Sequence, residues 1–349
     1  MSDVISYKCP NCGAPLTFNI PSQKWECHFC ASTFDKSESN QFEQQGGGGS
    51  NFWNPEAFAD EDAAVYECPS CGGQVITDKN TSSTFCAYCH NPTVLASRLK
   101  GEYRPARLIP FQFTREQAVE AVKKLCKGRP LLPKEFRKCA ENGEITGLYV
   151  PFWLFSADVD ATMTATGRRI HTWSDGNYRY TKTDVYHVQR EGTVPFRLVP
   201  VDGSSRMDDR LMDGLEPFSY DQLMQFSMEY LSGFYAENFD VDSQSSFRRF
   251  SSRATGGAEQ ALRDTVRGYT SVDSVKTATK FNGNDCLYVM LPVWTLMISY
   301  KGKTYLYAMN GQTGKAVGKL PVSLGRVAAW FAGLTAAFSM LFFLGMMLL

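Results

Sequence analysis

Eight of the eleven cysteines in this 349-residue chain form four CxxC pairs near its N-terminus. The pairs fall into two sets of one design, because fourteen residues separate the two pairs in each set. The sets are Cys9, Cys12, Cys27 and Cys30, and then Cys68, Cys71, Cys86 and Cys89. A CxxC turn places two sulfurs on one side of the chain, and two such turns can enclose Zn²⁺ in a tetrahedron of thiolates. The sequence therefore predicts two zinc ribbons, each with one zinc ion.

Four thiolates leave no open coordination position, so both zinc ions are predicted to be structural rather than catalytic. Each ribbon is too small for a self-sufficient core, and metal binding would supply most of its folding free energy. Gly13 and Gly72 follow the first pair of each set and suit a left-handed exit from the turn. His28 and His90 lie beside ligands, but with four sulfurs already present we expect them on the surface.

The charge of the two ribbons argues against nucleic acid as their partner. Residues 1–45 carry three lysines against five acidic residues, and residues 60–97 carry one lysine against five. Each four-thiolate zinc centre adds about two negative charges. Such surfaces repel a phosphate backbone, so a protein partner is the better interpretation. The aromatic residues Trp25, Phe29, Phe85 and Tyr88 are expected to form the small cores of the ribbons.

The rest of the chain favours an α+β domain that contains a possible internal duplication. A Pro-Phe unit introduces a predicted helix twice, over residues 115–125 and 222–235. Each is followed by a Leu-Tyr-Val strand with a Pro and a Trp, at 148–153 and 287–294. Two further strands, 294–300 and 303–309, are predicted to meet at Lys301-Gly302. The predicted domains are ribbon 1 (1–36), a flexible Gly-rich linker (37–64), ribbon 2 (65–97), the α+β domain (98–325) and a C-terminal helix (326–349).

Residues 327–349 carry no charged side chain and are long enough, as a helix, to cross a bilayer. A transmembrane helix is therefore predicted, with a buried core helix as the alternative. Lys315, Lys319 and Arg326 precede it, so the N-terminal domains are expected to be cytoplasmic in a single-pass protein of the cell membrane. The small residues Ala329, Gly333 and Ala337 recur every fourth position and predict close helix packing or weak self-association.

No sequence motif of an enzyme active site is found, and the chain is predicted not to be an enzyme. His171, Asp175, Asp184 and His187 are close enough in sequence to suggest a metal site. Residues 179–187, however, are typical of an exposed β-hairpin, which is the interpretation we favour.

The CPxCG and CxxC motifs resemble the zinc ribbons of transcription factor IIB type and of small RNA polymerase subunits. Two ribbons, an α+β region and a hydrophobic C-terminus together resemble an uncharacterised family of bacterial double zinc-ribbon membrane proteins. That resemblance also rests on the PFW and LPVW motifs of the predicted strands. It implies an association with envelope-stress modules that include band-7/stomatin-type and phage-shock-protein-A-like proteins.

Together these observations predict a non-enzymatic membrane scaffold or adaptor whose ribbons dock a cytoplasmic or membrane-associated protein partner. The alternative is a membrane-tethered nucleic-acid-binding protein that acts in transcription or replication.

Overall fold

The protein is dominated by β-sheet, in contrast to the predicted α+β class. The structure, a computed structural model, describes residues 4–35, 43–47 and 63–348, apart from positions 73, 79, 88, 142 and 144. Strands account for 44% of the structure and helices for 26%. The α+β prediction is therefore wrong, because segments expected to be loops belong to very long strands.

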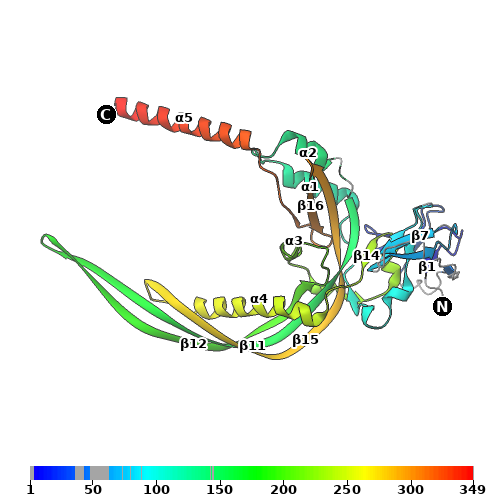
Figure 1. The fold of residues 1–349 in the computed structure, drawn as a ribbon, viewed down its shortest axis with the longest axis horizontal. Coiled ribbons are helices and arrows are strands. Elements are labelled where there is room, and N and C mark those ends of the chain that lie inside the picture. Colours follow the sequence, from blue (N-terminus) through cyan, green and yellow to red (C-terminus); the bar gives the residue numbers. More distant parts are fainter. Residues whose placement is uncertain are drawn as a thin grey trace.

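Three antiparallel strands form a curved arm that Figure 1 shows extending from the body of the molecule. Strand β11 (Ile145–Asp175) lies between β12 (Tyr178–Asp202) and β15 (Ser271–Tyr300). Along β11, residues 157–165 alternate small or apolar side chains with Asp and Thr, and the first kind is buried. This period of two explains why the segment is a strand with one covered face.

Helix α4 (Ser243–Asp264) covers the concave face of the arm (Figure 1). Its N-cap residue Asp242 accepts a hydrogen bond from the backbone N–H of Ser245. Buried residues at spacings of four, including Phe250, Ala254 and Ala258, face the strands. Phe250 stacks on Phe155 with ring centroids 5.0 Å apart.

The short strands and the helices of the body lie at the other end of β11 and β15. Strand β16 (Lys303–Asn310) pairs with β15, with Tyr300 opposite Lys303, so the predicted turn at Lys301-Gly302 is confirmed. Helix α1 (Arg115–Cys126) confirms the first predicted helix and begins with a capping box from Thr114. The remaining elements of this end are α2 (Lys134–Glu141), α3 (Asp209–Gly214), β10 (Arg107–Leu108) and β17 (Ala316–Gly318).

Of the predicted internal duplication, both Leu-Tyr-Val strands form but the second helix does not. The two Leu-Tyr-Val strands are neighbours, with Leu148 opposite Val293 and Trp153 opposite Tyr288. The second predicted helix, 222–235, does not form. That stretch instead contains short elements, namely η5 (Tyr220–Gln222), β13 (Met224–Gln225), η6 (Met228–Leu231) and β14 (Tyr235–Glu237).

The N-terminal ribbons join the main sheet instead of standing apart from it. Ribbon 1 contains β1 (Val4–Lys8), β2 (Thr17–Asn19), β3 (Lys24–Glu26) and β4 (Thr33–Phe34). Ribbon 2 contains β6 (Ala63–Glu67), β7 (Gln74–Asp78), β8 (Thr81–Phe85) and β9 (Pro92–Val94), followed by η3 (Ala96–Leu99) and η4 (Gly101–Tyr103). Within the predicted linker, β5 (Glu43–Gly47) pairs with β1, and most of the other linker residues lie outside the described ones.

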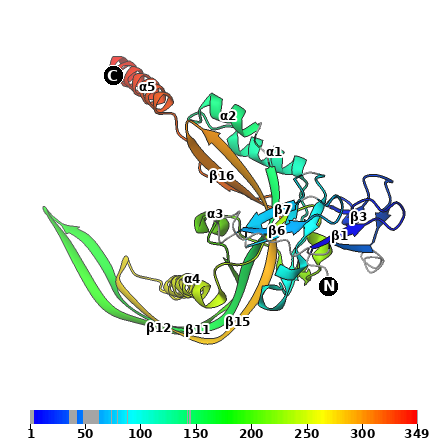
Figure 2. The same ribbon diagram turned by 45° about the vertical axis from the view of Figure 1, so that its right-hand side comes forward.

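Helix α5 (Leu324–Leu348) projects from the body on the side toward which the arm extends (Figures 1 and 2). Its side chains are described from Leu324 to Met340, a rise of about 26 Å at 1.5 Å per residue. Among the described residues, no helix combines the length and the apolar character needed to cross a membrane. The predicted transmembrane helix over 326–349 and the single-pass localisation are therefore wrong.

Candidate metal centres

The four sulfurs of ribbon 1 converge on one point. The Sγ atoms of Cys9 and Cys30 lie 3.6 Å apart, and those of Cys12 and Cys27 lie 3.4 Å apart. All four sulfurs lie within 4.8 Å of one another. Cys9 and Cys27 are buried, whereas Cys12 and Cys30 are exposed, so the centre lies at the edge of the ribbon.

Ribbon 2 repeats this arrangement. The Sγ atoms of Cys68 and Cys89 are 3.7 Å apart, and those of Cys71 and Cys86 are 3.8 Å apart. The same alternation of buried and exposed ligands recurs. The two predicted ligand sets are therefore confirmed as spatial clusters.

These distances fit zinc and exclude disulfides. A tetrahedron with Zn–S bonds of about 2.3 Å has sulfurs about 3.8 Å apart, whereas a disulfide bond is about 2.05 Å long. Hydrogen bonding from Ser32, whose Oγ lies 3.1 Å from the sulfur, lowers the pKa of the Cys30 thiol to about 6, whereas burial raises the pKa values of Cys9, Cys68 and Cys89. Zinc binds thiolates, so its binding would displace the protons of these thiols. The sites thus fit two structural zinc ions.

Backbone turns hold the ligands in place. The N–H groups of Gly13 and Gly72 donate to the carbonyls of Cys9 and Cys68 over 2.8 and 2.9 Å. Both glycines have φ of +71°, as their position in the motif predicts. The second turn of each ribbon instead places Ala31 (φ +56°) and His90 (φ +55°) in the left-handed region.

The two histidines beside the ligands do not join the metal clusters formed by the described residues. The Nε2 atom of His28 lies 2.9 Å from Thr17 Oγ1 on the surface, and His90 is exposed. Both match the expected surface positions.

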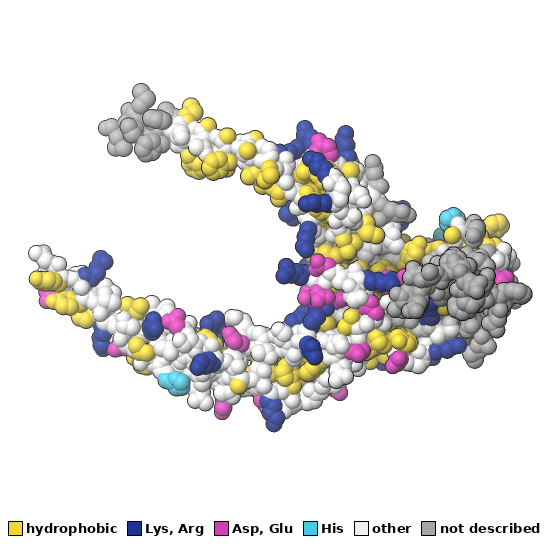
Figure 3. Space-filling model, viewed as in Figure 1, with side chains coloured by type: hydrophobic (Ala, Val, Ile, Leu, Met, Phe, Trp, Pro, Cys, Tyr) yellow, Lys and Arg dark blue, Asp and Glu magenta, His cyan; other side chains and the backbone are white. Residues whose placement is uncertain are grey.

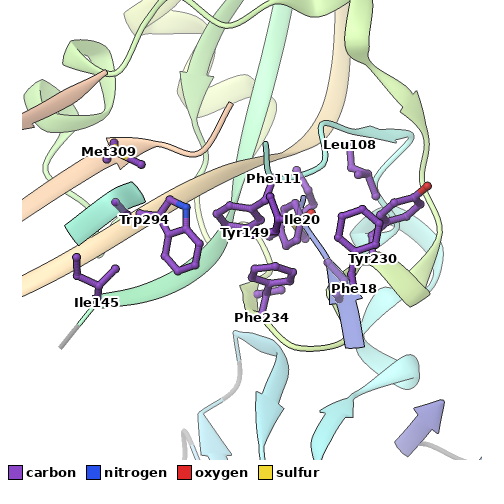
Figure 4. Packing of buried hydrophobic residues seen from close by; sticks show 14 of the residues in the cluster. Phe18, Ile20, Leu108, Phe111, Ile145, Tyr149, Tyr230, Phe234, Trp294 and Met309 are labelled. Atoms are coloured by element: carbon purple, nitrogen blue, oxygen red, sulfur yellow. The ribbon is translucent and has the colours of Figure 1, made fainter. Parts of the chain in front are cut away.

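Ribbon 1 is fixed to the body through an aromatic core (Figure 4). Trp25 is buried, and its ring centroid lies 5.6 Å from that of Phe18 and 5.2 Å from that of Tyr230. Its indole N–H donates to the carbonyl of Glu229 over 3.4 Å. These residues belong to the same cluster as Phe111 in the centre of the body.

Polar contacts fix the ribbon at two further points. Ser232 Oγ donates to the carbonyl of Leu16 over 2.8 Å, and Gln23 Nε2 donates to the carbonyl of Phe111 over 2.8 Å. Ribbon 1 is therefore an integral part of the body.

Ribbon 2 is held by strand pairing, by polar contacts and by Val94 and Ala96, which are buried in the main hydrophobic cluster. Strand β8 pairs with β14, with Ser83 opposite Ala236. The buried hydroxyl of Ser83 lies 2.9 Å from the carbonyl of Phe234 and 3.1 Å from that of Leu231. Arg98, which follows the ribbon in sequence, also contacts it, since its Nε donates to Tyr66 Oη over 2.8 Å.

The two ribbons also contact each other. Ile5 of β1 pairs with Val94 of β9, and Asn91 Nδ2 donates to the buried Ser6 Oγ over 3.0 Å. The two ribbons are therefore joined to each other as well as to the body.

The aromatic residues of the ribbons differ from the prediction in one case. Trp25 is buried, and Phe85 is half-buried against Tyr235. Phe29 lies between two zinc ligands and is 87% exposed, so its expected core position is wrong. The position of Phe29 between the two cysteines of a CxxC turn is the sequence signal that could have predicted its exposure. Tyr88, at the corresponding place in ribbon 2, lies outside the described residues.

The remaining candidate residues do not form a site among the described residues. Ala329, Gly333 and Ala337 are exposed on α5, and their role in helix packing stays a prediction. The predicted exposed hairpin is confirmed, because His171 lies opposite Lys182 on the exposed end of the β11–β12 hairpin.

Comparison with known proteins identifies a relative along nearly the whole chain. No family model matches the sequence, and no solved structure matches it. The sequence is 35% identical over 331 residues to "Uncharacterized protein YdjG" of Bacillus subtilis (strain 168). The match covers 95% of this chain and 94% of the relative. The protein therefore belongs to the family of B. subtilis YdjG.

Proposed function

We propose that this zinc-ribbon protein is a non-enzymatic adaptor whose ribbons dock a protein partner. The observation that carries the proposal is Phe29, 87% exposed between Cys27 and Cys30. Zinc would hold the backbone on both sides of this phenyl ring, so little conformational entropy is lost when a partner covers it. Pre-organised aromatic anchors of this kind dominate the energy of many protein interfaces.

The charge of the ribbons supports a protein partner rather than nucleic acid. Acidic residues outnumber lysines in both ribbons, and each zinc–thiolate centre adds about two negative charges. Phosphate-binding surfaces have the opposite sign. The expected partner surface is an apolar pocket with a basic rim.

The firm attachment of the ribbons suits an adaptor. A partner docked on Phe29 would be held in a fixed orientation relative to the arm and to α5. Band-7/stomatin-type and phage-shock-protein-A-like proteins of envelope-stress modules are the first candidates, because the resemblance of the sequence implies them.

The test uses the full-length, zinc-loaded chain with a photo-crosslinking amino acid at position 29. The matched control carries the same amino acid at Met297, which is 68% exposed on β15. We expect a crosslinked protein from position 29 only. Phe29→Ser should then weaken binding of that purified protein at least tenfold, while Met297→Ser leaves binding unchanged.

Equal crosslinking from both positions, or equal affinity of the Phe29→Ser variant, would overturn the proposal. Submicromolar binding of DNA or RNA near physiological salt would instead favour the nucleic-acid alternative.

A further inference from the structure

The far end of the arm is a two-stranded ribbon without a third strand. Strand β15 begins at Ser271, opposite Arg168. Beyond that point β11 and β12 continue alone, from Arg169 paired with Asp184 to Asp175 paired with Tyr178. Figure 1 shows this tip as the point of the arm most remote from the body. A two-stranded ribbon buries little surface by itself, so its exposed side chains are available to a partner.

One face of the tip carries aromatic rings and cations. Trp173 and Tyr180 are cross-strand partners whose rings stack, with centroids 5.6 Å apart and planes inclined by 17°. Tyr178 lies beyond them at the turn. Toward the body, the guanidinium of Arg169 lies 5.1 Å from the ring centroid of Tyr186.

The opposite face of the tip is more polar. Ile170 is 43% exposed on the side away from Trp173, where the other side chains are those of Thr172, Ser174, Arg179, Thr181 and Thr183. Trp173 itself is 50% exposed. The exposed aromatic rings of the tip therefore lie on one face.

The tip also has a slight basic balance. Residues 169–184 carry Arg169, Arg179 and Lys182 against Asp175 and Asp184, a net charge of +1. One ion pair lies within the tip, since Lys182 Nζ is 3.1 Å from Asp184 Oδ1. Figure 3 shows hydrophobic and basic side chains together at this end of the arm.

We propose that the hairpin tip docks into the headgroup layer of an anionic lipid bilayer. Trp173, Tyr178 and Tyr180 would enter the interface, where amphipathic aromatic rings are favoured. Arg179 and Lys182 would bind lipid phosphates. The open strand edges limit the depth of insertion, because unpaired backbone groups are costly in hydrocarbon.

Single-stranded nucleic acid suits the tip less well than lipid does. Bases stack on free aromatic faces. Trp173 and Tyr180 already cover one face of each other.

The test is hydrogen–deuterium exchange of the full-length, zinc-loaded protein, read in peptides that cover residues 169–184. Peptide-level readout separates the tip from lipid binding elsewhere in the chain. Three additions are compared: vesicles of phosphatidylcholine, vesicles with one-third phosphatidylglycerol, and a single-stranded oligonucleotide. We expect slower exchange in the tip with the anionic vesicles alone.

Two tip variants and one control sharpen the test. Trp173→Ser/Tyr180→Ser should abolish the protection, and the exchange of that variant without lipid reports whether the hairpin remains formed. Arg179→Gln/Lys182→Gln keeps the aromatic rings and should raise the anionic lipid concentration needed for half-protection about thirtyfold, at about tenfold per 1.4 kcal/mol. Phe29→Ser should change nothing, so the tip and the ribbon surface are tested independently.

Several results would overturn the proposal. They are unchanged exchange with all additions, equal protection by neutral vesicles, and protection by the oligonucleotide. Lipid-free protection that rises with protein concentration would show that a second copy covers the tip instead.

Discussion

The two zinc ribbons share one ligand geometry but are attached to the body in different ways. In ribbon 1, Cys9 and Cys27 belong to the main hydrophobic cluster, together with Trp25 and Phe111. In ribbon 2, Val94 and Ala96 also belong to that cluster, but the ligands Cys68 and Cys86 form a small separate cluster with Val75. The buried ligands are therefore part of the main core in one ribbon and lie outside it in the other.

Loss of a buried ligand should produce the largest difference between the ribbons. Cys27→Ser and Cys86→Ser are each expected to lower the zinc content from two ions to one per chain. Cys27→Ser should cost more than about 4 kcal/mol of unfolding free energy, because it also disturbs the main core. Cys86→Ser should cost less. Metal analysis and chemical denaturation measure both effects, and equal losses of stability would contradict the comparison.

Truncation of the anchoring aromatic residues should give the next largest difference. Trp25→Ala removes a fully buried side chain and should cost about 3–5 kcal/mol. Phe85→Ala in ribbon 2 removes a half-buried ring that packs against Tyr235 and should cost about 1 kcal/mol. Urea unfolding of the two variants checks the order, which would be reversed if ribbon 2 were the better-anchored one.

Acidic residues next to the ribbons should respond to pH in different ways. Burial raises the pKa of Glu229 beneath ribbon 1, and its Oε2 is buried without a hydrogen-bond partner among the described residues. Because the folded state holds this proton more tightly, stability falls as pH rises from the ordinary glutamate range through the raised pKa. Glu229→Gln should remove that fall and add up to about 1–3 kcal/mol at pH 7.

Glu237 in β14, the strand that pairs with ribbon 2, serves as the control. Burial raises its pKa too, but the guanidinium of Arg206 lies 3.6 Å from its carboxylate and opposes the shift. Glu237→Gln should therefore bring no gain in stability at pH 7. The unfolding free energy measured between pH 4 and 8 tests both variants. Identical pH dependence in the Glu229→Gln and Glu237→Gln variants would contradict the expected difference between the two glutamates.

The smallest expected effect is common to both ribbons. Ala31 and His90 have left-handed backbone conformations, which disfavour side chains with a Cβ atom. Ala31→Gly and His90→Gly should each stabilise the zinc-bound protein by a few tenths of a kcal/mol up to about 1 kcal/mol. Thermal unfolding measures this gain. A loss in either variant would show that the side chain has a further contact that the turn requires.

The zinc centres could be predicted from the sequence because their determinants are local. The spacing of Cys9, Cys12, Cys27 and Cys30 and the glycine after the first pair define the turns without reference to the rest of the chain. The turn at Lys301-Gly302 and helix α1 were predictable for the same reason, since a hairpin turn and a capping box are short-range signals.

The errors arise where tertiary contacts decide the structure. Phe226, Tyr230 and Phe234 have the spacing of an α-helix, yet all three are buried in a segment that forms no α-helix and packs against ribbon 1. The side chains of ribbon 1 supply contacts that helical sequence periodicity cannot anticipate. The arm was missed because its strands extend far beyond the apolar motifs into polar sequence, where a hydrophobic pattern is weak.

Hydrogen–deuterium exchange before and after removal of zinc by a chelator tests most directly whether the ribbons are metal-held parts of the body. We predict that exchange accelerates in both ribbons and also in residues 227–234, because Trp25 and Leu16 contact Glu229, Tyr230 and Ser232 there. Acceleration confined to the CxxC turns, with residues 227–234 unchanged, would contradict the account and show that the ribbons fold and unfold independently of the core.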